Sequence, residues 1–187
     1  MKHSVLVVVS IAALSLAGCG KKADAPMPSG SATATDTAMT APSATATATP
    51  GQMFADTAAA SDMFEIETSK LAATKAQSAK VKRFAEEMIK AHTDSTAQLK
   101  TAAAAASPAI TPAAALTPAQ QKTLDDLSAK SGADFDQAYA DAQRTGHQAT
   151  LDALKAYSAS GDVPSLKAFA TKMVPIVTGH LNMAKSL

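Results

Sequence analysis

The segment VKRFAEEMI, residues 81–89, decides which type of secondary structure this chain builds. Its apolar residues recur every three or four positions, which places them on one face of an α-helix. The spacing continues further along the chain, and the residues on this face are Val81, Phe84, Ala85, Met88, His92, Ser95 and Leu99. Ser78 precedes the pattern and is a suitable N-cap, because its hydroxyl accepts a hydrogen bond from a free N–H of the first turn. The pattern predicts a helix that begins after Ser78.

A second segment, LKAFATKMV (166–174), repeats the first in its order of residue types. Both segments have the pattern apolar-Lys-x-Phe-Ala-x-x-Met-apolar, in which x is any residue. Upstream of them, ETSKLAATKA (67–76) and HQATLDALKA (147–156) share Leu, Lys and Ala at matching positions. A helical hairpin that occurs twice is a common way to build a four-helix bundle. A chance match between alanine-rich helices stays open as the alternative.

Apolar periodicity and stop signals divide the rest of the sequence into four long helices and a short one. The long helices are expected at about 56–76, after Ser78, at about 133–158, and from the turn SGDVP to the end. Thr117-Pro118 begins a short helix to about Ser128, since Pro is favoured at the first helical position. We expect an all-α, up-down four-helix bundle over residues 54–187, with the short helix in the central connection.

The N-terminus has the pattern of a bacterial export signal. Lys2 precedes an apolar run over residues 5–16, which is shorter than the roughly 20 residues needed to cross a bilayer. We therefore expect a signal peptide at residues 1–18. The stretch Leu16-Ala17-Gly18-Cys19 resembles the lipobox of bacterial lipoproteins. This resemblance implies that the chain is cleaved before Cys19 and that Cys19 is acylated. The acyl chains would anchor the protein at the membrane. The alternative is an ordinary cleaved signal with a chance cysteine.

Residues 19–53 are rich in Ala, Thr, Ser and Pro, a composition that cannot bury enough apolar surface to fold. We expect this segment to be a flexible tether between the lipid on Cys19 and the helical domain. Gly20 follows the cysteine, and by resemblance to other lipoproteins the lack of Asp there favours the outer membrane, facing the periplasm. Cys19 is the only cysteine, so no disulfide is expected within the domain.

Composition narrows the class of function. From Phe54 onward the basic and acidic residues balance at 14 each. With no basic patch and no aromatic platform, nucleic acid is not expected as a partner, and the membrane is the one partner that the sequence indicates. The sequence also lacks a Gly-rich phosphate loop and a nucleophile-elbow serine. These features favour a non-enzymatic protein without deciding the question.

Three histidines fall on apolar helix faces, one on each of three long helices: His92, His147 and His180. On the first helix, Glu67 lies among apolar residues and takes the position equivalent to His147 in the repeat. A rise of about 1.5 Å per residue puts these four side chains within about two turns of one another. One polar side chain from each long helix is therefore expected at a similar depth in the core.

A metal site is one interpretation of this pattern, because three imidazoles and a carboxylate suit Zn, Cu or Fe. Met88, Met173 and Met183 are possible auxiliary ligands, whose thioethers would favour copper. A di-iron site needs Glu-x-x-His motifs on two helices. The residues three before the histidines are instead Ile89, Arg144 and Val177. Di-iron chemistry is therefore not expected.

Two other interpretations stay open. The histidines could form a buried polar layer that fixes helix register, with the methionines filling gaps in the core. They could also bind a small ligand or handle protons. The sequence requires no cofactor. The one cofactor that it suggests is a single transition-metal ion.

Three segments carry a family resemblance: EIETSKLAATKAQSAKVKRFAEEMIKAHT (65–93), SGADFDQAYADAQRTGHQATLDAL (131–154) and LKAFATKMVPIVTGHL (166–181). Together they resemble a bacterial family called domain of unknown function 4142, from about Phe54 to the end. The resemblance implies a ferritin-like four-helix bundle in an exported protein, with no settled activity. The first hypothesis is a lipid-anchored, non-enzymatic envelope module that binds a partner or small ligand. The second is a metal-binding protein that uses Glu67, His92, His147 and His180.

Overall fold

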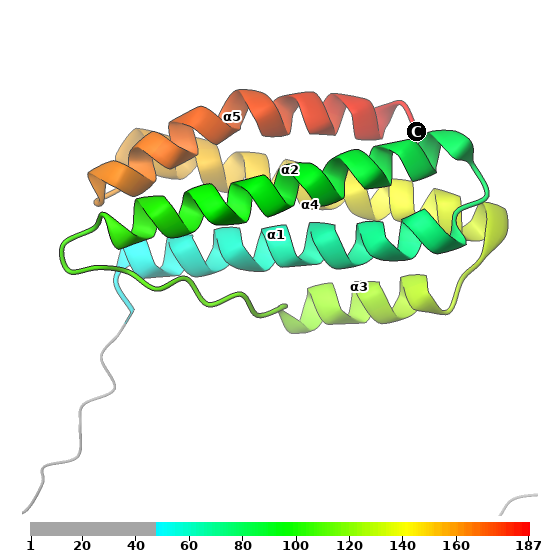
Figure 1. The fold of residues 1–187 in the computed structure, drawn as a ribbon, viewed down its shortest axis with the longest axis horizontal. Helices are drawn as coiled ribbons and strands as arrows, with labels where there is room; N and C mark the ends of the chain where they lie inside the picture. Colours follow the sequence, from blue (N-terminus) through cyan, green and yellow to red (C-terminus); the bar gives the residue numbers. More distant parts are fainter. Residues whose placement is uncertain (1–47) are drawn as a thin grey trace, which may run out of the picture. The chain divides into compact units, whose positions relative to one another are not determined.

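The computed structural model describes residues 48–187, and its named elements are all α-helices (Figure 1). They are α1 (Pro50–Lys75), α2 (Ala79–Ala104), α3 (Pro118–Ser128), α4 (Gly132–Ser160) and α5 (Pro164–Lys185). Within this part of the chain, no helix is both long enough and apolar enough to cross a membrane. The expected signal peptide, lipobox and Cys19 lie outside the described residues.

Hydroxyl side chains set the starts of three helices. The side chains of Thr49, Ser78 and Thr117 each accept a hydrogen bond from a backbone N–H of the first turn. Thr49 is followed by Pro50, whose fixed φ suits the first helical position. As a result α1 begins at Pro50, and the expected start at about Asp56 is wrong.

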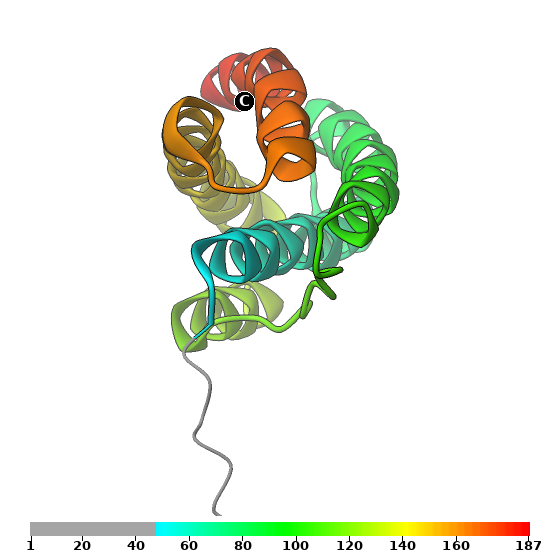
Figure 2. The same ribbon diagram turned by 90° about the vertical axis from the view of Figure 1, so that its left-hand side faces the viewer.

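The four long helices form two antiparallel hairpins, α1 with α2 and α4 with α5 (Figure 1). Viewed end-on they surround a common centre in the order α1, α2, α5, α4, because α1 also packs on α4 and α2 on α5 (Figure 2). The connection from α2 to α4 runs the length of the bundle, and α3 lies on it, outside the bundle against α1. One long crossover of this kind occurs in ferritin-like bundles. The predicted fold class is confirmed.

The two matching segments bury the same positions. In each, the first apolar residue, the Phe, the following Ala and the Met are at most 6% exposed. The four pairs are Val81 and Leu166, Phe84 and Phe169, Ala85 and Ala170, and Met88 and Met173. Each hairpin therefore presents the same apolar pattern to the core from its second helix.

The core consists of two apolar clusters with a polar layer between them. One cluster includes Phe54, Leu99 and Phe169, and the other includes Phe84 and Phe135. Between the clusters each long helix contributes buried polar side chains. We call this set the central layer: Asp62, Glu65, Thr68 and Ser69 from α1, His92 and Ser95 from α2, Gln143 and His147 from α4, and His180 from α5. The fold thus brings polar groups from four helices to the middle of the bundle, over about two turns of α1.

Candidate metal centre

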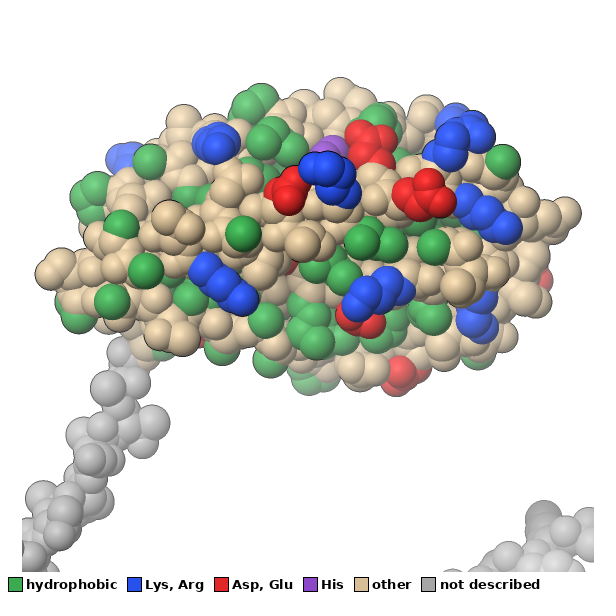
Figure 3. Space-filling view, viewed as in Figure 1, with side chains coloured by type: hydrophobic (Ala, Val, Ile, Leu, Met, Phe, Trp, Pro, Cys, Tyr) green, Lys and Arg blue, Asp and Glu red, His purple; other side chains and the backbone are tan. Residues whose placement is uncertain are grey.

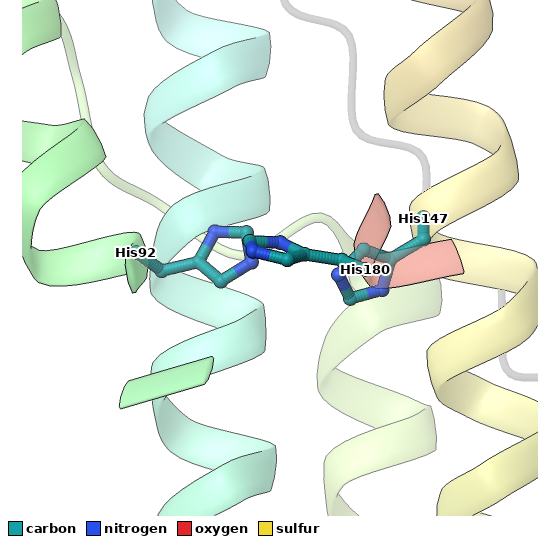
Figure 4. Close-up of side chains that lie close together, drawn as sticks. All are labelled: His92, His147 and His180. Atoms are coloured by element: carbon teal, nitrogen blue, oxygen red, sulfur yellow. The ribbon is translucent and has the colours of Figure 1, made fainter. Parts of the chain in front are cut away.

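Three imidazoles meet in the central layer, pointing toward one another from α2, α4 and α5 (Figure 4). The ring centroids lie 5.5 Å apart for His92 and His147, 5.7 Å for His92 and His180, and 5.5 Å for His147 and His180. One ring nitrogen of each lies within 4.8 Å of a nitrogen of both others. All three side chains are buried. The arrangement is a nearly equilateral triangle of potential nitrogen ligands.

Helix periodicity carries each histidine into this layer. Each lies three or four residues from buried neighbours on both sides along its helix, and therefore shares their inward face. The neighbours are Met88 and Ser95 for His92, Gln143 and Leu151 for His147, and Val177 and Ala184 for His180. The sequence-based expectation that these three histidines face the core at similar depth is confirmed.

His92 is held by a carboxylate from α1. Its Nδ1 lies 2.8 Å from Oδ1 of Asp62, and Thr96 donates a hydrogen bond to the other Asp62 oxygen over 3.2 Å. Burial opposes the charged imidazolium, but the hydrogen bond to Asp62 and the negative charges of Glu65 and Asp62 outweigh it, so the pKa of His92 is raised. The carboxylate orients the ring through Nδ1 and leaves Nε2 for another partner.

The other two imidazoles are neutral. His147 donates from Nδ1 to the backbone carbonyl of Gln143 over 2.9 Å, which leaves a lone pair on Nε2. Burial, helped by the positive charge of His92, lowers the pKa of His147 to about 3 and that of His180 to about 4. Neutral imidazole is the form in which histidine binds a metal.

Glu65 is a carboxyl group enclosed in the same layer. It is 1% exposed, and its Oε1 lies 3.5 Å from Nδ1 of His147. Burial raises the pKa of Glu65 to about 7, although the nearby His92 and the Gln143 amide act in the opposite direction. Gly146 makes room for this carboxyl group, because a Cβ at that position would lie 2.7 Å from Oε1 of Glu65.

Six buried polar atoms have no hydrogen-bond partner among the described residues, and all six belong to the central layer. They are Oε1 and Oε2 of Glu65, Nε2 of His92, Oε1 of Gln143, Nε2 of His147 and Nδ1 of His180. Leaving such an atom unpaired costs about 1–3 kcal/mol. These nitrogen and oxygen atoms are therefore available to bind one ion or small molecule together.

Glu67, which the sequence suggested as a ligand, does not lie with the histidines. Its carboxylate pairs with Lys70 at 2.8 Å, and the side chain is 37% exposed. Glu67 follows Glu65 by two residues, which is about 200° around a helix. Glu65 therefore points into the bundle and Glu67 points away from it.

The incorrect prediction that Glu67 faces the core has a physical cause in the packing of α1. The buried residues of α1 are mostly small or polar, with Phe54 and Phe64 among them, whereas the bulky Met63 and Leu71 are only partly buried. The small residues are Ala55, Ala59, Ala72 and, just past the helix, Ala76. Small side chains let helices approach closely, so Met63 and Leu71, which flank Glu67, marked the wrong face of α1. Asp62 and Glu65 lie on the buried face, and the sequence-based reasoning missed both.

The three methionines occupy ordinary core positions. Met88 and Met173 are buried in different apolar clusters, on opposite sides of the central layer. Met183 is partly buried against the cluster that contains Met88. Their suggested role as auxiliary ligands stays a prediction.

A repeated tripeptide marks two of the three histidines. Thr-Gly-His occurs at 145–147 on α4 and again at 178–180 on α5. The first glycine makes room for Glu65, whereas a Cβ at Gly179 would meet nothing within 4 Å. The repeat is a signal in the sequence that apolar periodicity alone does not use.

On one face of the bundle the central layer lies close to the surface. Figure 3 shows a histidine side chain in a small gap among interspersed acidic and basic side chains. Of the three histidines, His180 has the largest exposed fraction, 7%. His180 is therefore the histidine of the three that solvent reaches most.

Fold and site together define an all-α, ferritin-like bundle with a buried three-histidine cluster. A family model described as a domain of unknown function (DUF4142) matches residues 36–187, and the chain belongs to this family. No curated protein matches the chain, and no solved structure does. The family description assigns no activity.

Proposed function

We propose that this protein binds one transition-metal ion through His92, His147 and His180. The observation that carries the proposal is the convergence of three buried imidazoles whose ligand nitrogens lie within 4.8 Å of one another. Imidazole suits Zn, Cu and Fe, and burial keeps His147 and His180 in the neutral form that binds them.

The spacing of the nitrogens fits an ion after a small contraction. Zinc–nitrogen bonds are about 2.0–2.1 Å long, so the nitrogens of a tetrahedral site lie about 3.3 Å apart. Starting from separations of at most 4.8 Å, each ring nitrogen has to move inward by less than about 1 Å. We expect rotation of the side chains to supply this movement.

The charges of the central layer favour a divalent ion. Asp62 and Glu65 are its two carboxyl groups, and a buried carboxylate needs a compensating positive charge. A divalent cation would replace the positive charge of His92 beside Asp62 and would favour the ionised form of Glu65, so it balances both. Asp62 orients His92 through Nδ1, as carboxylates behind metal-binding histidines commonly do, and Glu65 lies 3.5 Å from the equivalent atom of His147.

Three protein ligands leave one position of a tetrahedral ion free for water or a small ligand. The Glu-x-x-His motifs of di-iron bundles are missing from the helices that carry the histidines. We therefore propose a site for a single ion. Whether the free position supports catalysis depends on the metal.

A second candidate function is a polar layer that fixes helix register without a metal. The Asp62–His92 pair favours it, as does the hydrogen bond of 2.8 Å between Ser69 and Tyr139, because buried polar pairs specify how helices align. The six partnerless atoms count against it, since a partly satisfied network is less stable than an apolar core.

We also propose that the bundle is held at the cell envelope, in the outer membrane facing the periplasm, through acylated Cys19. The support is the sequence Leu16-Ala17-Gly18-Cys19 after a short apolar run. Replacing Cys19 by Ser is expected to move the protein from the membrane fraction of bacterial cells to the soluble fraction. An unchanged distribution would contradict the anchor.

The decisive test of the metal site is elemental analysis of the protein purified from the periplasm or membrane without a polyhistidine tag. We expect about one equivalent of metal per chain, lost in a His92→Ala/His180→Ala double variant and in a His180→Gln single variant. A chelator should lower the melting temperature of the wild-type protein and leave that of His180→Gln unchanged.

Glu67→Gln is the matched control, because Glu67 is a carboxylate on α1 that points away from the histidines. It is expected to keep the metal. A metal-free wild-type protein whose melting temperature ignores added Zn, Cu and Fe ions would leave the polar layer as the function of these histidines.

A further inference from the structure

A groove of about 660 Å³ lies outside the bundle core, between α1, α3 and α4. This volume is in the usual range for small-molecule sites, about 300–1,000 Å³. Small residues line it at nearly every turn of α4: Ala138, Ala142, Gly146, Ala149 and Ala153. From Ala138 to Leu154 the groove follows α4 for about 24 Å at 1.5 Å per residue. The space is long and narrow.

Polar side chains in the walls of the groove mostly satisfy one another or their own helix. Thr57, Thr123 and Thr150 donate to backbone carbonyls four residues earlier, over 2.8, 3.0 and 2.9 Å. Ser61 and Thr150 also share a hydrogen bond of 2.7 Å across α1 and α4. These walls therefore present mainly apolar surface to a ligand.

The two ends of the groove differ in character. At one end lie Leu154 and Phe54, whose ring stacks on Tyr157 with centroids 3.9 Å apart. At the other end the lining includes Asp126, Lys130 and Asp141. Both carboxylates there have partners: Asp126 pairs with Lys122, and Asp141 pairs with Arg144. The ammonium of Lys130 has no ion-pair partner within residues 48–187, so it is the charge that remains for a ligand.

Contacts near both ends of the crossover hold α3 over the groove. Gln52 donates to the carbonyl of Thr111 over 2.9 Å, and Asp56 accepts from the N–H of Ala113 over 2.7 Å. At the end of α3, Lys75 donates to the carbonyl of Ser128. Leu127 is the only fully buried residue of α3, so this helix forms a wall of the groove and adds little to the core.

We propose that this groove binds one long unbranched alkyl chain that ends in a carboxylate. The chain lies along the alanines of α4 with its tail against Phe54, and the carboxylate lies beside Lys130. Narrow apolar walls fit a single chain, and the unpaired ammonium at one end selects an anionic head. The site is separate from the three histidines and does not depend on the proposed metal.

Binding of a fluorescent long-chain fatty acid, cis-parinaric acid, tests this proposal. The full exported chain carrying Cys19→Ser is used, so that no detergent competes for the groove. We expect saturable binding that palmitic acid displaces. Ala149→Phe, which fills the groove at an exposed position, should weaken binding more than about ten-fold, a loss of about 1.4 kcal/mol. Ala159→Phe, at an exposed position of α4 outside the lining, is the matched control and should bind normally.

The head group is tested separately. An exposed ion pair contributes up to about 1 kcal/mol, so Lys130→Gln should weaken palmitic acid binding about two- to five-fold. The same substitution should not change displacement by 1-hexadecanol, which has no charge. Because Lys130 is exposed, this variant does not put folding at risk. Equal affinity for the acid and the alcohol in the wild-type protein, or normal probe binding by Ala149→Phe, would overturn the proposal.

His180→Gln separates the two proposed sites. It is expected to lose the metal and to bind the fatty acid as the wild-type chain does. Loss of fatty acid binding in a folded His180→Gln protein would overturn the assignment of the ligand to the groove.

Discussion

The apolar clusters and the central layer are equally well buried, but they differ in how far their atoms are satisfied. Phe135 and Leu166 are fully enclosed in the clusters, where burial of apolar surface stabilises the fold. Glu65 and His147 are almost as completely enclosed in the layer, yet both carry polar atoms without partners. Burial alone does not distinguish the two regions, whereas a count of hydrogen-bond partners does.

This contrast gives each region an expected role, which is stability for the clusters and ligand binding for the central layer. An apolar side chain contributes to the fold whatever is bound, so the clusters should hold the bundle together with or without a ligand. A partnerless buried polar atom lowers stability until something binds it. The central layer should therefore respond to metal, to pH and to a change of one polar group, and the clusters should not.

The largest expected effect tests the clusters. Phe135→Ala removes a fully buried ring that stacks near Tyr139, and should cost about 3–5 kcal/mol of unfolding free energy. Urea unfolding with and without a chelator measures it. The loss should be the same under both conditions, because the ring makes no contribution to the proposed metal site. A loss that depends on the chelator would break the distinction between the two regions.

The next effect concerns Glu65 in the metal-free protein. Its pKa of about 7 in the folded chain lies above the usual 4.5, so the folded state holds this proton more tightly than the unfolded chain does. Stability is therefore expected to fall as pH rises from about 4.5 through 7. Glu65→Gln removes this loss and should stabilise the metal-free protein by a few kcal/mol at about pH 8.

Melting temperatures between pH 5 and 8 in a chelator measure the effect of Glu65→Gln. The difference between the wild-type protein and the variant should grow toward pH 8. Glu67→Gln serves as control and should follow the wild-type curve, since Glu67 is partly exposed. Parallel curves for Glu65→Gln and the wild type would show that the Glu65 carboxyl group titrates in the fold as it does in water.

The smallest effect compares two glycines, each next to a histidine of the site. Ala is a better helix former than Gly by about 0.5–1 kcal/mol, so Gly179→Ala, which meets nothing nearby, should stabilise the protein by that amount. Gly146→Ala places a Cβ against Oε1 of Glu65 and should not give this gain. Thermal unfolding of both variants measures the difference, and equal gains would mean that Glu65 moves aside freely.

Periodicity in the sequence predicted the histidines better than the carboxylates. On α2, α4 and α5 the inward face carries large apolar residues, so His92, His147 and His180 could be assigned to it directly. On α1 the inward face carries mainly small residues, and the bulk of Met63 and Leu71 pointed to Glu67 instead of Glu65. The rule that large apolar residues mark the buried face fails where two helices pack closely through small side chains.

By itself the sequence determined the helices, their pairing into two hairpins, the all-α bundle and the three histidines that face its core. These features depend on local spacing and on residue types, which a single chain displays. Only the tertiary structure decided that the three rings converge, that Asp62 and Glu65 join them, and that α3 leaves a groove beside α1 and α4. Those relations join residues far apart in the chain, and they depend on the rotation and separation of packed helices, which periodicity leaves undetermined.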